Sequence, residues 1–213
     1  MKIATKRQYI REFGEGTERA RYLGRALVER ARYQSPAGQI TNIPVTDQRD
    51  IVAFIFLEVS AKFESFAYLA FQYDICKWYN ITATRSEFVI GAAEGGTRRM
   101  FGWAVPERLA NRGNNLLTKE SFFGDLRNTI GEPLYQTLTV AHDLRNRVAH
   151  DPATAHSTIV EISQTLGIPQ GELKGLSVGR LLRDYPKGGN FAESYFEIFL
   201  QAYEDFAGMY ATY

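Results

Sequence analysis

The chain has 213 residues, of which 45% are hydrophobic and 13% aromatic, and its formal net charge is +1. This length is ample for one domain with a buried core, and the composition excludes an intrinsically disordered chain. The near-neutral charge excludes a general basic bias of the kind that binds nucleic acid without a defined site.

The N-terminal and cysteine patterns indicate the cytoplasm. Residues 1–7 are charged and lack the apolar core of a signal peptide, and the most apolar run, Ile51–Leu57, is too short to span a membrane. The single Cys76 cannot form an intrachain disulfide, and it lies in an apolar stretch that predicts a buried thiol rather than a nucleophile. We therefore expect a cytoplasmic protein that does not associate with a membrane.

The first predicted helix covers Thr17–Tyr33. Its apolar positions recur at the spacing of one buried helical face: Ala20, Leu23, Leu27 and Ala31. Residues 1–34 hold nine Lys and Arg against four Glu, a net charge of +5, so the remainder of the chain carries −4. Two interpretations of this basic arm stay open, a surface that binds phosphate and an ordinary solvated helix face.

The longest predicted helix runs from about Asp47 to Tyr79, after a connector at Ser35–Thr46 that contains two prolines and a glycine. Thr46 or Asp47 would cap it. Because the helix is apolar on most of its circumference, we expect it to form the spine of the core. Nine residues are predicted to face inward: Ile51, Phe54, Ile55, Val59, Phe63, Phe66, Ala67, Ala70 and Phe71.

The segment Thr82–Arg112 has the least regular pattern. Its glycines precede Arg98 and Arg99, but no Gly-Lys-Ser or Gly-Lys-Thr follows them, so this is not a phosphate-binding P-loop. Arg98, Arg99, Arg108 and Arg112 would form a second basic surface near an RNA backbone, and a surface excursion without a ligand is the open alternative. Pro106 is predicted to open a short helix through Asn111, because proline suits the first helical turn.

A further short helix is predicted within Leu117–Thr129, and a longer helix follows from Ile130. Its buried face is predicted to hold Leu134, Leu138, Ala141 and Val148. Pro152 ends this helix, because proline disfavours the α conformation in the residue before it. His150 is thereby placed in the last turn, where the carbonyl end of the helix favours an imidazolium.

This helix carries an Arg-Asn-x-x-x-His pattern from Arg145 to His150. On a late helix of a small α-helical protein, the pattern resembles the signature of the HEPN superfamily. The resemblance extends to Asp47–Tyr79, which is similar to the long helix beside the motif helix, and with Leu117–Asp151 it covers about half of the chain. It implies an all-α, HEPN-like helical bundle with additional short helices and loops, and the length predicts one domain over residues 1–213.

The resemblance also implies an activity. Many HEPN proteins are metal-independent ribonucleases of toxin–antitoxin, abortive-infection and CRISPR systems, and they commonly act as dimers whose motifs meet at the two-fold axis. We therefore expect Arg145, Asn146 and His150 to be catalytic, without a metal or cofactor. The expected RNA contacts are Arg147, Arg98 and Arg99. The expected partners are single-stranded RNA or tRNA, a second copy of the chain, and an antitoxin or a partner in a defence complex.

The chemistry of these side chains suits such roles. A histidine exchanges protons near neutral pH, and Arg145 would hold phosphorane oxygens as a permanently charged, forked donor. Asn146 would fix the imidazole or donate to phosphate. Arg145 and His150 are five residues apart and point away from each other on a straight helix, so either the last turn unwinds or a second subunit completes the site. Glu58 or Glu64 would orient Arg145 through a bidentate pair, or both lie on a solvated stripe.

Other interpretations stay open. The motif could be a polar helix end in which Arg145 pairs with Asp143 or Asp151. The chain could also be a noncatalytic HEPN-type subunit of a defence complex that binds RNA, a nucleotide or a partner. His142 and His156 are single histidines without partners at metal-binding spacing, so the sequence predicts no metal site.

The C-terminal part contains one weaker alternative and a final helix. Ile159–Leu182 faintly resembles the helix-turn-helix of a DNA-binding regulator, but glycines interrupt its second helix and Lys174 is the only basic residue there before Arg180. Phe191–Tyr210 is predicted as an amphipathic helix. Its inward side is predicted to hold Phe191, Tyr195, Ile198, Phe199, Ala202 and Phe206.

Overall fold

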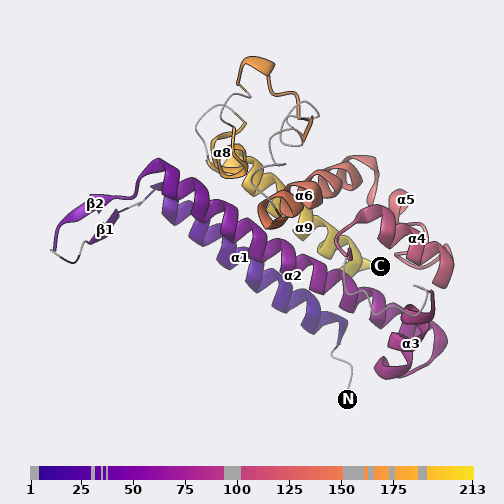
Figure 1. Ribbon diagram of the computed structural model, residues 1–213. Helices are drawn as coiled ribbons and strands as arrows, with labels where there is room; N and C mark the ends of the chain where they lie inside the picture. Colours follow the sequence, from indigo (N-terminus) through magenta and orange to yellow (C-terminus); the bar gives the residue numbers. More distant parts are fainter. Residues whose placement is uncertain are drawn as a thin grey trace. The chain divides into compact units, whose positions relative to one another are not determined.

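The computed structural model is built almost entirely of helices (Figure 1), so the predicted all-α class is confirmed. It describes residues 5–29, 32–34, 36, 38–93, 102–150, 161–162, 166–172, 176–186 and 191–213. Its α-helices are α1 (Lys6–Glu29), α2 (Val45–Tyr79), α3 (Ala83–Ala93), α4 (Pro106–Leu116), α5 (Leu126–Ile130), α6 (Glu132–His150), α8 (Val178–Asp184) and α9 (Tyr195–Thr212). The remaining described elements are two short 3-10 turns, η1 (Gln170–Glu172) and η2 (Phe191–Glu193), and the strands β1 (Arg32–Gln34) and β2 (Ile40–Asn42).

Helix α1 begins well before the predicted start at Thr17 and ends before Tyr33. It buries a face of mostly small residues, spaced by three and four: Phe13, Thr17, Ala20 and Gly24. A Cβ at Gly24 of α1 would lie 2.8 Å from the ring of Phe196 of α9, so α1 and α9 approach too closely for a side chain at position 24. Leu23, predicted to be buried, is 38% exposed, because this close packing selects small residues rather than the most apolar ones.

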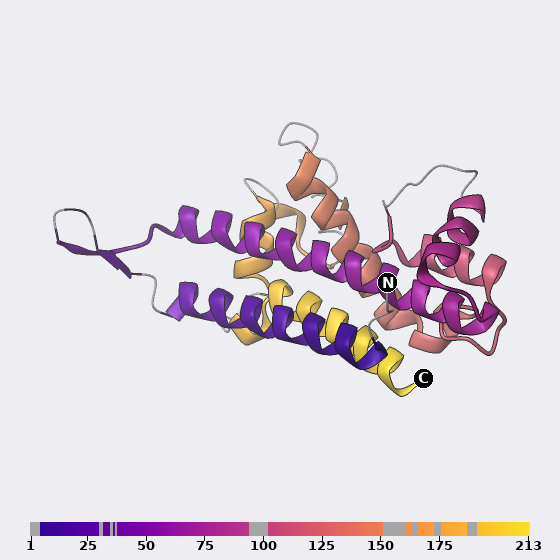
Figure 2. The ribbon, with the colours of Figure 1, turned by 90° about the horizontal axis from the view of Figure 1, so that it is seen from below.

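A β-hairpin replaces the end of the predicted first helix and part of the predicted connector. β1 pairs antiparallel with β2, with Tyr33 opposite Thr41 and Gln34 opposite Ile40. Figures 1 and 2 both show this hairpin extending from the end of α1 and the start of α2. Tyrosine, isoleucine and threonine favour extended backbone, and the intervening proline and glycine favour a turn, which explains the strands.

Helix α2 matches its prediction in length but not in every inward residue. It begins at Val45, so Thr46 and Asp47 lie inside its first turn instead of capping it. Phe54 is 67% exposed, although the sequence placed it in the core, whereas Val52 and Phe56 are fully buried. On a helix that is apolar all round, hydrophobicity does not identify the buried side.

The chain forms two compact units. Unit 1 comprises residues 1–16, 61–139 and 202–213, and unit 2 comprises residues 17–60 and 140–201. The divisions fall inside α1, α2, α6 and α9. The expectation of a single domain stays a prediction.

Unit 1 has an aromatic core. Phe63 of α2 stacks on Tyr203 of α9 with ring centroids 4.3 Å apart. Phe66 and Phe122 both meet Phe206 edge-on, with centroids 6.5 Å and 5.2 Å away. Such edge-to-face pairs add a specific geometry to the burial of large apolar surface. The core therefore fixes the ends of α2 and α9 against the segment before α5.

Unit 2 is held by aromatic packing and by charged pairs. Phe56 of α2 meets Phe199 of α9 at a centroid distance of 5.8 Å. Arg49 of α2 donates to Asp184 of α8 through Nε and Nη2, at 2.9 Å and 2.6 Å, a two-donor arrangement that fixes the orientation of the guanidinium. Ile198, predicted to face inward, is 37% exposed because neighbouring α9 residues fill the core instead.

Candidate active site on helix α6

Helix α6 carries the motif at the end of its buried face. Leu138 and Ala141 are buried as predicted, and Arg145 follows on the same face, four residues after Ala141. Leu134 and Val148, also predicted for the core, are half-buried, as is Arg145 itself. The guanidinium is thus partly removed from water, where its bonds to an anion are stronger than in bulk solvent.

Arg145, Asn146 and His142 form a hydrogen-bonded chain, which we call the α6 relay. Arg145 Nη1 donates to Asn146 Oδ1 at 3.1 Å, and Asn146 Nδ2 lies 2.8 Å from His142 Nε2. A guanidinium can only donate, so the carboxamide oxygen faces Arg145 and the NH2 group faces the imidazole. When the imidazole is neutral with its proton on Nδ1, His142 Nε2 accepts this bond from the Asn146 amide.

The relay identifies a histidine that the sequence prediction passed over. The sequence analysis considered His142 only as a metal ligand, whereas in the structure Asn146 Nδ2 lies 2.8 Å from its ring nitrogen Nε2. The spacing contained the signal: residues four apart share a helical face, so Asn146 is aligned with His142 as well as with His150. In the structure, Asn146 contacts both His142 and Arg145 through its carboxamide group.

His150 lies in the last turn of α6, and its side chain is outside the described part of the structure. The helix is continuous through His150, so its last turn is not unwound. Five residues of a helix with 3.6 residues per turn correspond to roughly 140° of rotation, so positions 145 and 150 lie on different faces of α6. The helix therefore does not unwind to join the two positions, and completion of the site by a second copy of the chain stays a prediction.

The charged neighbours of the relay lie on the same helix. Desolvation raises the pKa of the Asp143 carboxyl, while His142 and Arg147 act in the opposite direction. Arg147 is half-buried and four residues from Asp143, so part of its charge acts on that carboxylate. Its predicted contact with RNA stays a prediction. Of the predicted second basic surface, Arg98 and Arg99 lie outside the described residues and Arg108 is exposed. The prediction is wrong for Arg112, which is 6% exposed and lies with its guanidinium 4.0 Å from the ring centroid of Trp103.

Glu58 and Glu64, the two carboxylates of α2 that were candidates to orient Arg145, differ in their surroundings. Glu64 Oε1 accepts hydrogen bonds from the backbone N–H groups of Gly102 and Trp103, at 2.7 Å and 3.1 Å. It therefore holds the chain just before α4. Glu58 is exposed, and its predicted pairing with Arg145 stays a prediction.

The basic arm divides into structural and peripheral charges. Arg21 Nε lies 2.8 Å from Glu197 Oε2, and Arg25 Nε lies 3.3 Å from Oε1 of the same carboxylate, whose side chain is only 7% exposed. A buried carboxylate needs such partners, because an isolated charge is costly to remove from water. These two arginines thus stabilise unit 2, whereas Arg11 pairs with Glu15 on the surface.

The segment that resembled a helix-turn-helix does not offer a free recognition helix in its described part. α8 has seven residues, and four of them are buried: Val178, Gly179, Leu181 and Leu182. A Cβ at Gly179 would lie 2.2 Å from the carbonyl oxygen of Arg49, so α8 packs directly on α2 backbone. Arg180 is half-buried, and Lys174 lies outside the described residues.

The described residues were also compared with the requirements of a metal site, of a membrane-spanning helix and of known families. Across the described ranges, no three His, Cys, Asp or Glu residues gather as metal ligands. None of the helices described combines the length and apolar character needed to cross a bilayer, and Cys76 is buried as predicted. No family model, curated protein or solved structure matches the chain.

Proposed function

We propose that this chain is a metal-independent endoribonuclease of a toxin–antitoxin, abortive-infection or related defence system. The observation that carries the proposal is the α6 relay, in which His142 and Asn146 hold the Arg145 guanidinium one to two turns before His150. The HEPN resemblance of the motif suggests the reaction. The relay adds a physical reason for an asparagine directly after the arginine.

In the proposed reaction, RNA is cut by its own 2′-hydroxyl. O2′ forms a bond to phosphorus while the P–O5′ bond breaks; a base accepts the proton from O2′ and an acid protonates O5′. His150 serves as the acid–base group, which is worth about 10²–10⁴-fold in rate. The products are a 2′,3′-cyclic phosphate and a 5′-hydroxyl.

Arg145 stabilises the negative charge that develops on the phosphorane. Its planar fork matches two phosphate oxygens, and it stays charged at any working pH. A long side chain normally loses conformational freedom when it binds an anion. Because Asn146 already restrains the guanidinium, the relay lowers that cost and presents the donors in advance.

The site is proposed to be completed by a second copy of the chain. Arg145 of one protomer and His150 of its partner would face the same phosphate across a two-fold axis, because a rotation of roughly 140° about the helix axis separates the two positions within one copy. Single-stranded RNA or tRNA would enter at this axis, with Arg147 contacting the backbone. An antitoxin or defence partner would act by covering it.

The test is incubation of purified protein with total tRNA and with a single-stranded RNA in EDTA, beside His150→Ala and Arg145→Ala variants. Cleavage by the wild type alone, leaving cyclic-phosphate ends, supports the proposal. Equal cutting by all three proteins indicates contamination or another site and contradicts it. RNA binding without cutting by the wild type would favour a noncatalytic RNA-binding subunit instead.

A further inference from the structure

A second site lies within unit 1, apart from the α6 relay. It is a cavity of about 510 Å³ at the end of α2, and we call it the Asp74 pocket. Its lining comes from four segments of the chain and consists of Lys6 of α1, Tyr73, Asp74, Lys77 and Trp78 of α2, Leu117, Glu120, Ser121 and Phe122, and Tyr210 with Tyr213 at the C-terminal end of α9. This volume lies in the range of small-molecule sites.

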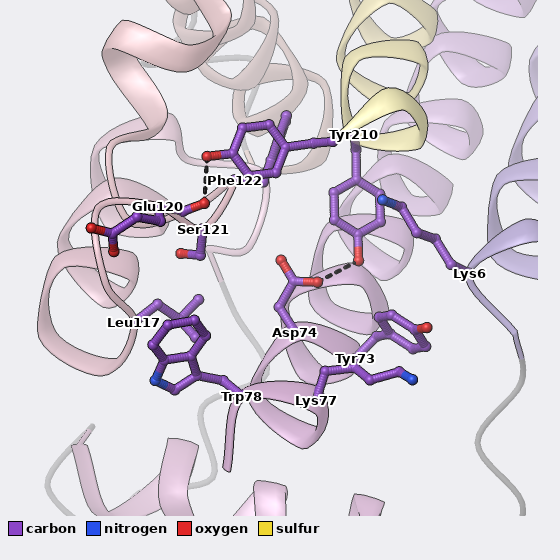
Figure 3. A pocket seen from close by; sticks show the side chains of 11 residues that line it. Lys6, Tyr73, Asp74, Lys77, Trp78, Leu117, Glu120, Ser121, Phe122 and Tyr210 are labelled. Carbon is purple, nitrogen blue, oxygen red and sulfur yellow. Dashed lines mark hydrogen bonds between the residues drawn. The ribbon is translucent and has the colours of Figure 1, made fainter. Parts of the chain in front are cut away.

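The walls of the Asp74 pocket are aromatic and accessible. Trp78 is 50% exposed and Tyr213 is 56% exposed, although both are large apolar rings. Tyr213 is held in place by a hydrogen bond from its hydroxyl to the carbonyl oxygen of Glu120, at 2.6 Å. Trp78 extends from the last turns of α2 beside Leu117 (Figure 3). A planar ring can therefore enter and stack on the indole face.

Two ammonium groups lie at the other side of the pocket. Lys6 Nζ sits 4.3 Å from the ring centroid of Tyr210, and Lys77 Nζ sits 5.7 Å from that of Tyr73. Figure 3 shows Lys6, Tyr73 and Lys77 on the side of Asp74 away from Trp78. The tyrosine faces hold both cations without neutralising them. An anionic group is the natural complement of this side.

A carboxylate stands between the aromatic and the cationic sides. Asp74 Oδ1 accepts a hydrogen bond from the Tyr210 hydroxyl at 2.9 Å, and the Asp74 side chain projects into the centre of the lining residues (Figure 3). Burial raises the pKa of Asp74 to about 6, with Tyr210 and Lys6 opposing the rise. A partly desolvated carboxylate with an oxygen directed at a cavity is a strong acceptor for N–H donors.

We propose that the Asp74 pocket binds a nucleotide. The base stacks on Trp78 and donates an N–H to Asp74, and the phosphate lies at Lys6 and Lys77. The ligand is a free mononucleotide or an unpaired terminal nucleotide of an RNA strand, which share this chemistry. The proposal is independent of the ribonuclease proposal, because none of these residues belongs to the α6 relay.

Other ligand classes fit the pocket less well. An organic cation would be repelled by Lys6 and Lys77. A divalent metal would need more oxygen ligands than Asp74 supplies among those cations, and no metal-type cluster occurs in the described chain. A lipid tail would place hydrocarbon against the Asp74 carboxylate and the Lys6 ammonium and would form no hydrogen bond with either.

The experiment uses the two tryptophans as probe and internal reference. Trp78 is exposed in the pocket, whereas Trp103 is 2% exposed. Titration of the whole chain with AMP, GMP, CMP or UMP, excited at the red edge of indole absorption, should quench Trp78 saturably with a dissociation constant below about 1 mM. The matching nucleosides and inorganic phosphate should each bind about tenfold or more weakly, because each lacks one half of the contacts.

Two variants assign the contacts. Lys77→Gln should weaken mononucleotide binding about tenfold but leave nucleoside binding unchanged, whereas Lys119→Gln, an exposed lysine outside the lining, should change neither. Asp74→Asn should alter the preference among the four bases. Calorimetry of Trp78→Leu should show lost binding with an unchanged melting temperature. Saturable quenching of Trp78 by a short single-stranded RNA, weakened by Lys77→Gln and retained in Arg145→Ala, supports the site without mononucleotide binding and identifies RNA as the source.

The proposal is overturned by either of two results. One is the absence of saturable binding of every mononucleotide and of the RNA at millimolar concentration. The other is binding that persists undiminished in both Lys77→Gln and Trp78→Leu. Because Arg145→Ala should leave this binding intact, loss of nucleotide binding and loss of RNA cleavage are distinguishable.

Discussion

The α6 relay and the Asp74 pocket are built in opposite ways. The relay takes its three residues from five consecutive positions of one helix, His142 to Asn146, so helical spacing alone aligns them. The pocket assembles residues from Lys6 to Tyr213, which only the tertiary fold brings together. A motif search therefore detects the first region and has no means of detecting the second.

A similar contrast holds between two carboxylates that are partly or fully removed from water, Glu197 and Asp74. In unit 2, Glu197 is held by Arg21 and Arg25, two permanent charges. In unit 1, Asp74 has a tyrosine hydroxyl as its hydrogen-bond donor, and its pKa rises to about 6. The paired carboxylate stabilises the fold, whereas the desolvated one weakens it in return for an accessible acceptor. This difference is expected between a charge that stabilises the fold and the ligand-binding charge that we propose for Asp74.

The largest expected effect is on the proposed ribonuclease activity. Arg145→Ala should lower the RNA cleavage rate about 10²–10³-fold, because a charged donor to the phosphorane is lost. Arg145→Lys should recover only a small part of the rate, since an ammonium lacks the planar fork. Single-turnover cleavage in EDTA measures both. Wild-type rates in both variants would remove Arg145 from the mechanism.

A stability effect of similar size is expected at Glu197. Arg21→Ala should lower the free energy of unfolding by about 3 kcal/mol, because it leaves a buried carboxylate with one longer-range partner. Arg11→Ala, in an exposed pair with Glu15, should change it by less than about 0.5 kcal/mol. Urea denaturation of both variants at pH 7 gives the comparison, and equal losses would contradict a special role for the Glu197 cluster.

Substitution of Asp74 is expected to raise the free energy of unfolding, whereas substitution of Arg21 lowers it. Its pKa is higher in the folded chain than in the unfolded chain, so its ionisation favours unfolding and stability falls as the pH rises from about 4 through 6. Asp74→Asn should therefore stabilise the fold by about 2 kcal/mol above pH 7 and by little below about pH 4. Denaturation at both pH values is compared with Asp50→Asn, an exposed carboxylate on the same helix. A pH-independent difference would show that desolvation is not the cause.

A smaller effect is expected at the outer member of the relay. His142→Ala should lower the cleavage rate about tenfold with little change in KM, because it frees Asn146 and loosens Arg145. His142→Gln supplies a carbonyl that accepts from the Asn146 amide and should recover much of the loss. Equal rates in Ala and Gln variants would make His142 irrelevant to positioning.

How far the sequence predicts this molecule depends on how local each feature is. The all-α class, the long helix ending at Tyr79 and the burial of Leu138 and Ala141 follow from periodicity, which is a local property. The hairpin at Arg32–Asn42 was missed because short strands leave little pattern in a segment that also satisfies helical spacing. Phe54 was misplaced because an all-round apolar helix has no preferred side.

The candidate sites also show that local features are the predictable ones. Arg145 and Asn146 were selected from the Arg-Asn-x-x-x-His pattern, and a hydrogen bond joins them in the structure. His142 was accessible to the same spacing argument but was judged as an isolated histidine. Asp74 was not accessible at all, because its significance depends on Tyr210, which lies far along the chain and meets it only after folding.

The central claim is that Arg145 and His150 act together from different copies of the chain. The direct measurement mixes two inactive variants, Arg145→Ala and His150→Ala, after co-refolding, and assays RNA cleavage in EDTA. Half of the random dimers are then mixed, and each mixed dimer holds one intact composite site, so activity should return to about a quarter of the wild-type value. Activity that stays at the level of the separate variants would contradict the account.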